Sequence, residues 1–226
     1  LKGTVDWGEK ADWEGVTAFI LATQAGRHAD GRPDIVNFSD ARRGVYPCVP
    51  AWIARRTGSG VAQWAVEEVA EPGYFLDFLW YEPERPVVPP PDALKDVRLD
   101  IGWVISRTGW QPDDAVLAFR SGGPANHEHA DRNSFLFKVY GERLLTDHPG
   151  AAYDPRHPGW LLRLTEAHNA VLVGGEGHQY HRGEEGTNAG LAEAHVVRHE
   201  ADGDRVWWCS DATHGYHLVD PDVVAV

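Results

Sequence analysis

The sequence predicts an α+β multidomain fragment, in which a helical region precedes an antiparallel β-sandwich. In the first third of the chain, apolar residues recur at intervals of three and four positions, the spacing of one helix face. Beyond the stretch EPERPVVPPPDALKD they fall instead in short β-type runs between turn residues. Because that stretch is rich in proline, we expect an extended linker there. We therefore predict a helical part at residues 1–82, a linker at 83–96 and a sandwich at 97–226.

Helical spacing is present in three segments before the linker, at residues 13–26, 49–70 and 75–83. The intervening stretch, 34–44, is rich in turn residues, and its side chains at Asn37, Ser39 and Asp40 are suited to capping the next helix. The many aromatic residues of this part favour packing between helices. Stacking of one or two of them on sugar rings is the alternative interpretation.

Short apolar runs separated by Gly, Pro, Asp and Asn continue to the end of the chain, as in an antiparallel sandwich. The sequence contains no methionine, even at position 1, and its last run stops at Val226. Both observations favour a fragment of a longer protein, with the sandwich cut before its last strands. The runs that we predict as strands lie within residues 100–110, 115–123, 134–148, 168–175, 191–200 and 205–216.

The formal net charge is −13 and the isoelectric point is near 5.3, which argues against nucleic acid as a partner because phosphate binding needs a basic stripe. No apolar run approaches the roughly 20 residues of a membrane helix, so we expect no membrane span. Cys48 and Cys209 have neither a disulfide framework nor zinc-ribbon spacing, and we expect free thiols. No sequence feature indicates an oligomeric state.

The segment NHEHADRNSF carries the strongest signal of chemistry. In an extended backbone, alternate residues share one face, which predicts that His127, His129 and Asp131 lie on the same side. Asp147 and His168 each stand at the edge of another apolar run, so the five residues include a plausible His/Asp/His metal set. On spacing alone, however, unrelated polar turn residues are the favoured interpretation.

A longer pattern changes that balance. The segment FRSGGPANHEHADRNSFLFKVYGERLLTDHPGAAY, followed by AHNAVLVGGEGHQ, resembles the C-terminal β-domain of the heparinase II/III-like polysaccharide lyases. IGWVISRTGW is similar to the first sandwich strand of that family, and VNFSDA is similar to a turn near the end of its helical toroid. The resemblance implies the end of an incomplete (α/α) toroid, then a β-sandwich, with a polysaccharide cleft between them.

The same resemblance implies a structural zinc ion held by His129, Asp147 and His168. Asp131 would then lie beside the ligands, and His127 would face the cleft. The implied reaction is β-elimination on a uronate-containing glycan of glycosaminoglycan or alginate type, in a periplasmic or secreted enzyme. Much of the catalytic machinery of the family lies in the toroid, so we expect the fragment alone to be inactive. The alternative is a non-catalytic, zinc-braced module that binds glycan or stabilises a partner domain.

Candidate residues for contact with an acidic polysaccharide follow from their chemistry. His127 is suited to positioning the substrate, Asn126 to donating to its carboxylate and Tyr153 to acting as a phenolic acid. Arginine binds carboxylates through paired hydrogen bonds, which makes Arg107, Arg120 and Arg163 candidates for substrate binding. For Tyr153 and the arginines, a purely structural role is the competing interpretation.

Overall fold

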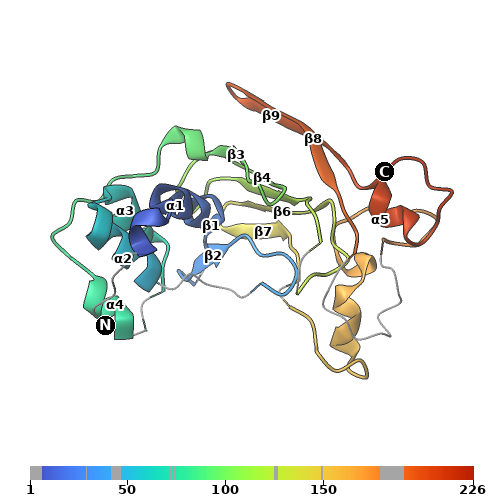
Figure 1. Cartoon of the computed structure of the whole chain (residues 1–226), viewed down its shortest axis with the longest axis horizontal. Helices are drawn as coiled ribbons and strands as arrows, with labels where there is room; N and C mark the ends of the chain where they lie inside the picture. The colour runs from blue at the N-terminus through green and yellow to red at the C-terminus, as the bar shows by residue number, and fades with distance from the viewer. Residues whose placement is uncertain are drawn as a thin grey trace.

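The structure, a computed structural model, describes residues 7–28, 30–41, 47–71, 73, 75–124, 127–148, 150–178 and 191–226. Helices form one end of the molecule and a five-stranded antiparallel sheet forms the middle, with a long hairpin over the sheet and a short C-terminal helix at the other end (Figure 1). This order agrees with the predicted change from helical to β-type sequence.

The helical end contains the 3-10 helix Trp7–Lys10 and four α-helices. Asp12 caps α1 by accepting from the Gly15 amide, and Ser59 caps α3 by accepting from that of Ala62. The predicted helical region at 49–70 is divided into two helices by Gly58, which has the left-handed φ of 77° that glycine adopts without steric cost. The helices are α1 (Trp13–Ala22), α2 (Cys48–Thr57), α3 (Gly60–Glu68) and α4 (Phe75–Trp80).

After α1 the chain enters a small antiparallel hairpin, β1 (Gln24–Arg27) and β2 (Pro33–Ile35), so the prediction of a helix through residue 26 is wrong at its end. This hairpin and the segment after it pack on the five-stranded sheet. One hydrophobic cluster therefore joins the two sides of the proline-rich stretch, and the domain boundary at 83–96 stays a prediction. The buried members of the cluster are Ala22, Ala25, Val36, Phe38, Ile105, Val116, Ala118 and Leu136.

The central sheet is a meander in which each strand pairs with the next along the chain. Side chains along β5 and β6 alternate between buried and half-buried, as expected for strands with one face against a core. Ile105, Ala118 and Leu136 are register partners on three adjacent strands and are fully buried. The strands are β3 (Asp96–Arg98), β4 (Trp103–Arg107), β5 (Val116–Arg120), β6 (Ser134–Val139) and β7 (Glu142–Leu145), and the short 3-10 helix Asp92–Leu94 precedes them.

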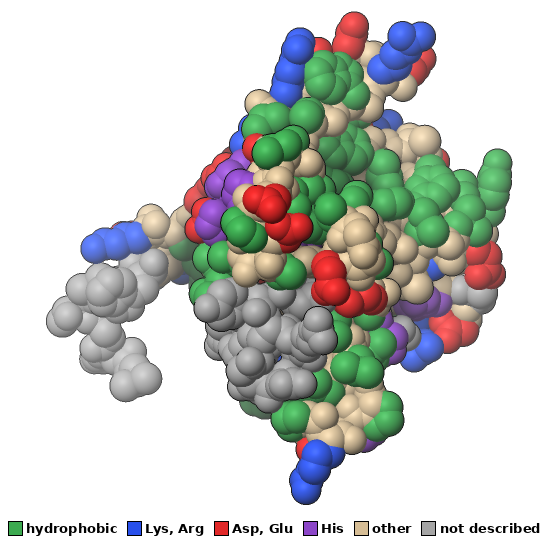
Figure 2. All heavy atoms as spheres, turned by 90° about the vertical axis from the view of Figure 1, so that its right-hand side faces the viewer, with side chains coloured by type: hydrophobic (Ala, Val, Ile, Leu, Met, Phe, Trp, Pro, Cys, Tyr) green, Lys and Arg blue, Asp and Glu red, His purple; other side chains and the backbone are tan. Residues whose placement is uncertain are grey.

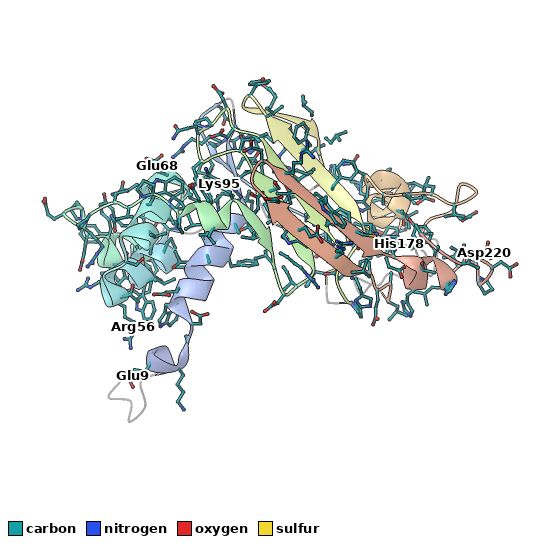
Figure 3. All side chains as sticks on the ribbon, turned by 90° about the horizontal axis from the view of Figure 1, so that it is seen from above. Glu9, Arg56, Glu68, Lys95, His178 and Asp220 are labelled. Atoms are coloured by element: carbon teal, nitrogen blue, oxygen red, sulfur yellow. The ribbon has the colours of Figure 1, made fainter. Side chains whose placement is uncertain are left out.

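The last strands, β8 (His195–Asp202) and β9 (Arg205–Asp211), form a separate hairpin that crosses the sheet when seen from above (Figure 3). Trp208 of β9 packs on Phe119 of β5, with ring centroids 5.5 Å apart. The chain then turns into α5 (Thr213–His217), so the predicted run at 205–216 ends early as a strand.

The predicted strand at 168–175 is wrong. Two 3-10 helices, Pro158–Arg163 and Thr165–Ala167, lead into this segment, and only an isolated bridge between Val173 and Glu176 forms there. Gly174 and Gly175 both have positive φ, and they turn the chain back before a ladder can extend.

Two expectations from composition are tested directly. Cys48 is buried, Cys209 is exposed and both are free, as predicted. None of the helices in the described ranges is long and apolar enough to cross a membrane.

Candidate active site and metal centre

The HEHAD motif lies in the loop between β5 and β6, not on a strand. β6 begins at Ser134, and both His127 and Asn133 have left-handed backbone conformations, with φ of 60° and 58°. The prediction that alternate residues of the motif share one strand face is therefore wrong. The loop turns His127 outward, with 56% of its side chain exposed, while His129 and Asp131 are buried.

Asp131 is drawn into the interior by Arg120. Nη1 of Arg120 lies 2.6 and 2.5 Å from the two carboxylate oxygens of Asp131, and the backbone amide of Ser39 donates to the same carboxylate over 3.0 Å. Burial alone would raise the pKa of Asp131, but the positive charges around it, that of Arg120 first, together outweigh burial and lower the pKa to about 2. The carboxylate is thus ionised and fixed in place.

His168 is held by a second buried carboxylate. Its Nδ1 lies 2.9 and 3.1 Å from the two oxygens of Asp147, and Ser134 donates its hydroxyl to Asp147 over 3.0 Å. Burial works against a charged imidazole, but the hydrogen bond to Asp147 and the negative charges of Asp131 and Asp147 together overcome it and raise the pKa of His168. With Nδ1 directed at Asp147, Nε2 of His168 is left for another partner.

His129, Asp131 and His168 form a cluster in which one ligand atom from each lies within 4.8 Å of the others. Nδ1 of His129 and Nε2 of His168 are buried without a hydrogen-bond partner among the described residues. Two unsatisfied imidazole nitrogens beside a carboxylate fit a divalent metal ion such as zinc. The predicted set differs in one position: Asp147, expected as a ligand, contacts His168 here, and Asp131 occupies the cluster.

Asp40 links this buried centre to the surface, and the sequence analysis missed it as a site residue. Its carboxylate accepts the Tyr153 hydroxyl over 2.5 Å and lies 3.2 Å from Nδ1 of His127 and 3.0 Å from Nε2 of His129. Burial raises the pKa of Asp40, but the hydrogen bonds from Tyr153 and the two histidines outweigh it and lower the pKa. The VNFSDA resemblance was the available signal; capping, the role assigned to this stretch, is wrong because α2 has no side-chain cap.

Two of the three catalytic candidates meet at the surface. Nδ1 of His127 lies 3.0 Å from the Tyr153 hydroxyl, and 61% of Tyr153 is exposed. The hydrogen bond to ionised Asp40 raises the pKa of Tyr153, which keeps its proton in place. Asn126, the third candidate, lies outside the described residues.

The three arginines predicted to bind substrate are all buried, with 6%, 3% and 4% of Arg107, Arg120 and Arg163 exposed. Arg120 is paired with Asp131 and also contacts Glu128. Arg163 lies under the Tyr153 ring, 5.0 Å from its centroid, and donates to the Ala152 carbonyl. Arg107 is the last residue of β4, whereas Arg120 pairs with Trp103 at the first position of that strand. The structure therefore does not bring the three arginines together.

Comparison with known proteins adds to this geometry. Residues 91–224 match the family model described as "Heparinase II/III-like, C-terminal". This range includes the five-stranded sheet, the HEHAD loop and His168. The chain belongs to the heparinase II/III-like family. No match is found among curated proteins.

Solved structures similar to this heparinase II/III-like chain share its fold at low sequence identity. A mutant of the heparan sulfate lyase HepC from Pedobacter heparinus has a TM-score of 0.57 at 14% identity, covering 88% of this chain and 28% of that one. A heparinase III described as the BT4657 gene product gives 0.51 at 17%, covering 78% and 25%. A structure titled "Crystal Structure of Heparinase III" gives 0.51 at 13%, covering 89% and 29%. The chain thus spans less than a third of the length of these relatives.

The surface charge of this family member is uneven. On the face drawn in Figure 2, lysine and arginine side chains are scattered toward the edges, whereas acidic and histidine side chains lie among large apolar areas. With a net charge of −13, the overall field repels an acidic glycan. Attraction of such a ligand therefore depends on local groups such as His127.

Proposed function

We propose that the chain is part of a polysaccharide lyase that cleaves a uronate-containing glycan by β-elimination. The observation that carries this proposal is the cluster of His127 and Tyr153 around the Asp40 carboxylate, at the surface of a heparinase II/III-like fold. The similar structures named as heparan sulfate lyase and heparinase III support a glycosaminoglycan substrate, and alginate is the second substrate class.

β-Elimination at a uronate has three requirements: the carboxylate is neutralised, the C5 proton is removed, and the C4–O bond breaks as the departing oxygen gains a proton. We assign the last task to Tyr153, because its phenolic hydroxyl is exposed at the surface beside His127. His127 and Asn126 are assigned to the substrate carboxylate. The C5 proton passes to a base from the toroid of the parent protein, and the C4=C5 double bond forms.

The three arginines have different places in this proposal. The guanidinium of Arg163 lies beneath the Tyr153 ring, and we propose it as the arginine that acts on the substrate. Arg120 supports the site by fixing Asp131. Arg107 is too far along β4 to contact the same sugar.

The proposed lyase activity is tested with the full-length parent protein. We expect it to release unsaturated products, seen as ultraviolet absorbance, from at least one of heparan sulfate, chondroitin sulfate or alginate, with zinc present.

Tyr153→Phe removes the proton donor and is expected to lower kcat by about 10²-fold or more. His127→Ala is expected to lower kcat/KM, whereas His195→Ala, an exposed histidine on β8, is the matched control and leaves both unchanged. Absence of product from every glycan, or an active Tyr153→Phe variant, would contradict the assignment; glycan binding without product would favour the non-catalytic module.

We further propose that a zinc ion is held by His129, His168 and one carboxylate, either Asp131 or Asp147. A metal there would use the two unpaired imidazole nitrogens and would connect the HEHAD loop to the segment around His168. Its role is to brace the loop that presents His127. Asp131 lies in the cluster but is also paired with Arg120, whereas Asp147 lies at Nδ1 of His168 and would serve as the third ligand only if His168 turned that nitrogen toward the ion.

Metal analysis tests this centre. We expect one zinc per chain in the purified protein, and we expect His129→Gln or His168→Gln to abolish it, as measured by elemental analysis after dialysis. Comparison of the zinc content of Asp147→Asn with that of Asp131→Asn identifies which carboxylate is the third ligand. His195→Gln is the control. Full zinc stoichiometry in both histidine variants would rule the centre out.

The remaining family features belong to the same proposal. We infer that α1 to α4 are the end of an (α/α) toroid, and that the five-stranded sheet with the β8–β9 hairpin is part of a β-sandwich. The proposed substrate is a polysaccharide outside the cell, which favours a periplasmic or secreted parent protein. Much of the catalytic machinery of the family lies in the toroid, so we expect the chain to be inactive alone.

A further inference from the structure

Ser39 and Asp40 are two buried residues that join the candidate site to the segment after β2. Ser39 is 5% exposed, and the side chain of Asp40 is 6% exposed. Ser39 has a φ of 55°, a left-handed conformation that costs energy in a residue with a side chain. Strain of this kind persists where the surrounding contacts hold the residue in place, and it clusters at functional sites. The contacts of this Ser39–Asp40 turn therefore bear on the function of the site.

Ser39 ties two loops of the site to the turn. Its backbone amide and its hydroxyl both donate to the Asp131 carboxylate, over 3.0 and 2.9 Å, and its hydroxyl oxygen accepts from the amide of His129 over 3.1 Å. Its carbonyl accepts from the amide of Gly150 over 3.1 Å. Asp131 and His129 belong to the HEHAD loop, and Gly150 belongs to the loop that follows β7. The turn therefore fixes the two loops relative to each other.

The two carboxylate oxygens of Asp40 have different partners. Oδ1 accepts from the amide of Ala151 over 3.3 Å and lies 3.0 Å from Nε2 of His129, in the interior. Oδ2 accepts from the Tyr153 hydroxyl and lies 3.2 Å from Nδ1 of His127, at the surface. More than half of each of these two surface side chains is exposed, and exposed side chains move among several rotamers unless a contact fixes them. Asp40 therefore determines where the Tyr153 hydroxyl lies relative to the His127 ring.

We infer that Asp40 is a positioning residue for the reaction and holds the Tyr153 hydroxyl in a fixed place beside His127. The inference rests on the proposed lyase function. Asp40 acts through Tyr153, because its buried carboxylate already accepts from donors of the protein itself. A displacement of a reacting group by about 1 Å can lower a rate by about 10²-fold, so loss of this contact has a large expected effect. Asp40 lies outside the matched residues 91–224, so this part of the site needs a residue from before the proline-rich stretch.

Asp40→Asn in the full-length parent tests this role kinetically. The asparagine keeps the size of the side chain and one oxygen for the Ala151 amide, but it places an amino group where Oδ2 accepted from the Tyr153 hydroxyl. We expect kcat to fall by about tenfold to a hundredfold. In a Tyr153→Phe background, the same substitution should lower kcat by no more than about threefold, because no hydroxyl is left to position. Asp154→Asn, in an exposed ion pair of the same loop, is the control and should leave kcat unchanged.

The comparison of the two backgrounds separates positioning from a general effect on the structure. An equal loss of kcat with and without the Tyr153 hydroxyl would show that Asp40 does not act through it, and would overturn the inference. The zinc content of Asp40→Asn should equal that of the parent, because the oxygen beside His129 is retained. A fall in zinc that accounts for the lost activity would place the effect at the metal ligands and would also overturn the inference.

A measurement on the chain itself separates this inference from the lyase proposal. With isotope-labelled tyrosine rings, the NMR signal of Tyr153 is the one that is absent from Tyr153→Phe. With EDTA present, we expect this signal to shift in Asp40→Asn and to stay in place in Asp154→Asn, because only the first removes the acceptor of the Tyr153 hydroxyl. An unshifted signal contradicts the role of Asp40 even when the parent is an active lyase. An inactive parent with a shifted signal contradicts the lyase and confirms the contact.

Hydrogen exchange of the unmodified chain needs no substitution, and it decides if Asp40→Asn does not fold. The amides of Gly150 and Ala151 donate to Ser39 and Asp40, so we expect both to exchange at least about tenfold more slowly than in an unfolded chain. Exchange of both amides at the unfolded rate would show that the turn does not hold this loop, and the inference would be wrong.

Discussion

Asp131→Asn is expected to lower the free energy of unfolding by about 3–5 kcal/mol, the usual cost of removing one partner of a buried ion pair. The asparagine has nearly the same shape, so packing is preserved while the negative charge is lost. Arg120, which is 3% exposed, then keeps its positive charge with only Glu128 close by, and the charge of Arg132 is also less compensated. Urea unfolding of the EDTA-treated protein measures this loss separately from any effect on metal binding.

The control is Asp154→Asn, whose ion pair with Arg156 is exposed and is expected to leave the free energy of unfolding unchanged. A pH series gives an independent signature. The pKa of Asp131 is about 2 when folded and ordinarily near 4 when unfolded, so its stabilisation is complete above about pH 4 and is lost as the pH falls toward 2. The variant lacks this component. Equal stability of Asp131→Asn and Asp154→Asn would show that the buried pair is not needed.

Asp34→Asn is expected to have a comparable effect at the junction between the helical end and the sheet, a loss of about 3–5 kcal/mol. Asp34 accepts from Nε of Arg143 over 2.9 Å and from Lys138 over 3.2 Å, and both Asp34 and Lys138 are almost fully buried. Burial raises the pKa of Asp34, but Arg143 outweighs it and lowers the pKa. Without the carboxylate, a buried ammonium group and a guanidinium group face each other uncompensated.

Two measurements sharpen this second prediction. Asp30→Asn breaks only the exposed pair with Arg32 and should leave the free energy of unfolding unchanged. The double variant Asp34→Asn, Lys138→Met removes the stranded ammonium group and is expected to recover part of the loss. A double variant that is less stable than Asp34→Asn would contradict this account.

Local periodicity predicted the elements that depend on local interactions. The spacing of apolar residues correctly indicated the helices around Trp13, Trp52 and Trp64 and the apolar strands β4 to β6. In each element this spacing places the apolar side chains on one face, which is the face that can be buried. The run at 168–175 failed because its apolar residues follow two 3-10 turns and meet two glycines with positive φ. An apolar run forms a strand only where a second strand is available to pair with it, and the run itself does not show whether one is.

The candidate site was predicted in part. His129 and His168 are brought together as the family resemblance implied, and their rings lie 5.3 Å apart. The local strand argument failed for the HEHAD motif because buried ion pairing of Asp131 with Arg120 folds the segment as a loop. Asp40 lies 87 residues before His127 in sequence, and apart from the VNFSDA resemblance nothing in its immediate neighbourhood indicates that it would hold two histidines and a tyrosine.

By itself, the sequence determined the family, the order of helices before strands, and the two histidines of the metal proposal. These follow from local spacing and from a motif whose residues stand close together in the chain. Only the tertiary structure decided that Asp40 joins His127 to Tyr153, that Asp131 is the carboxylate in the cluster, and that Arg107 is buried at the end of β4 away from Arg120. Each of these depends on charges buried together from distant segments, whose pairing is set by the global fold.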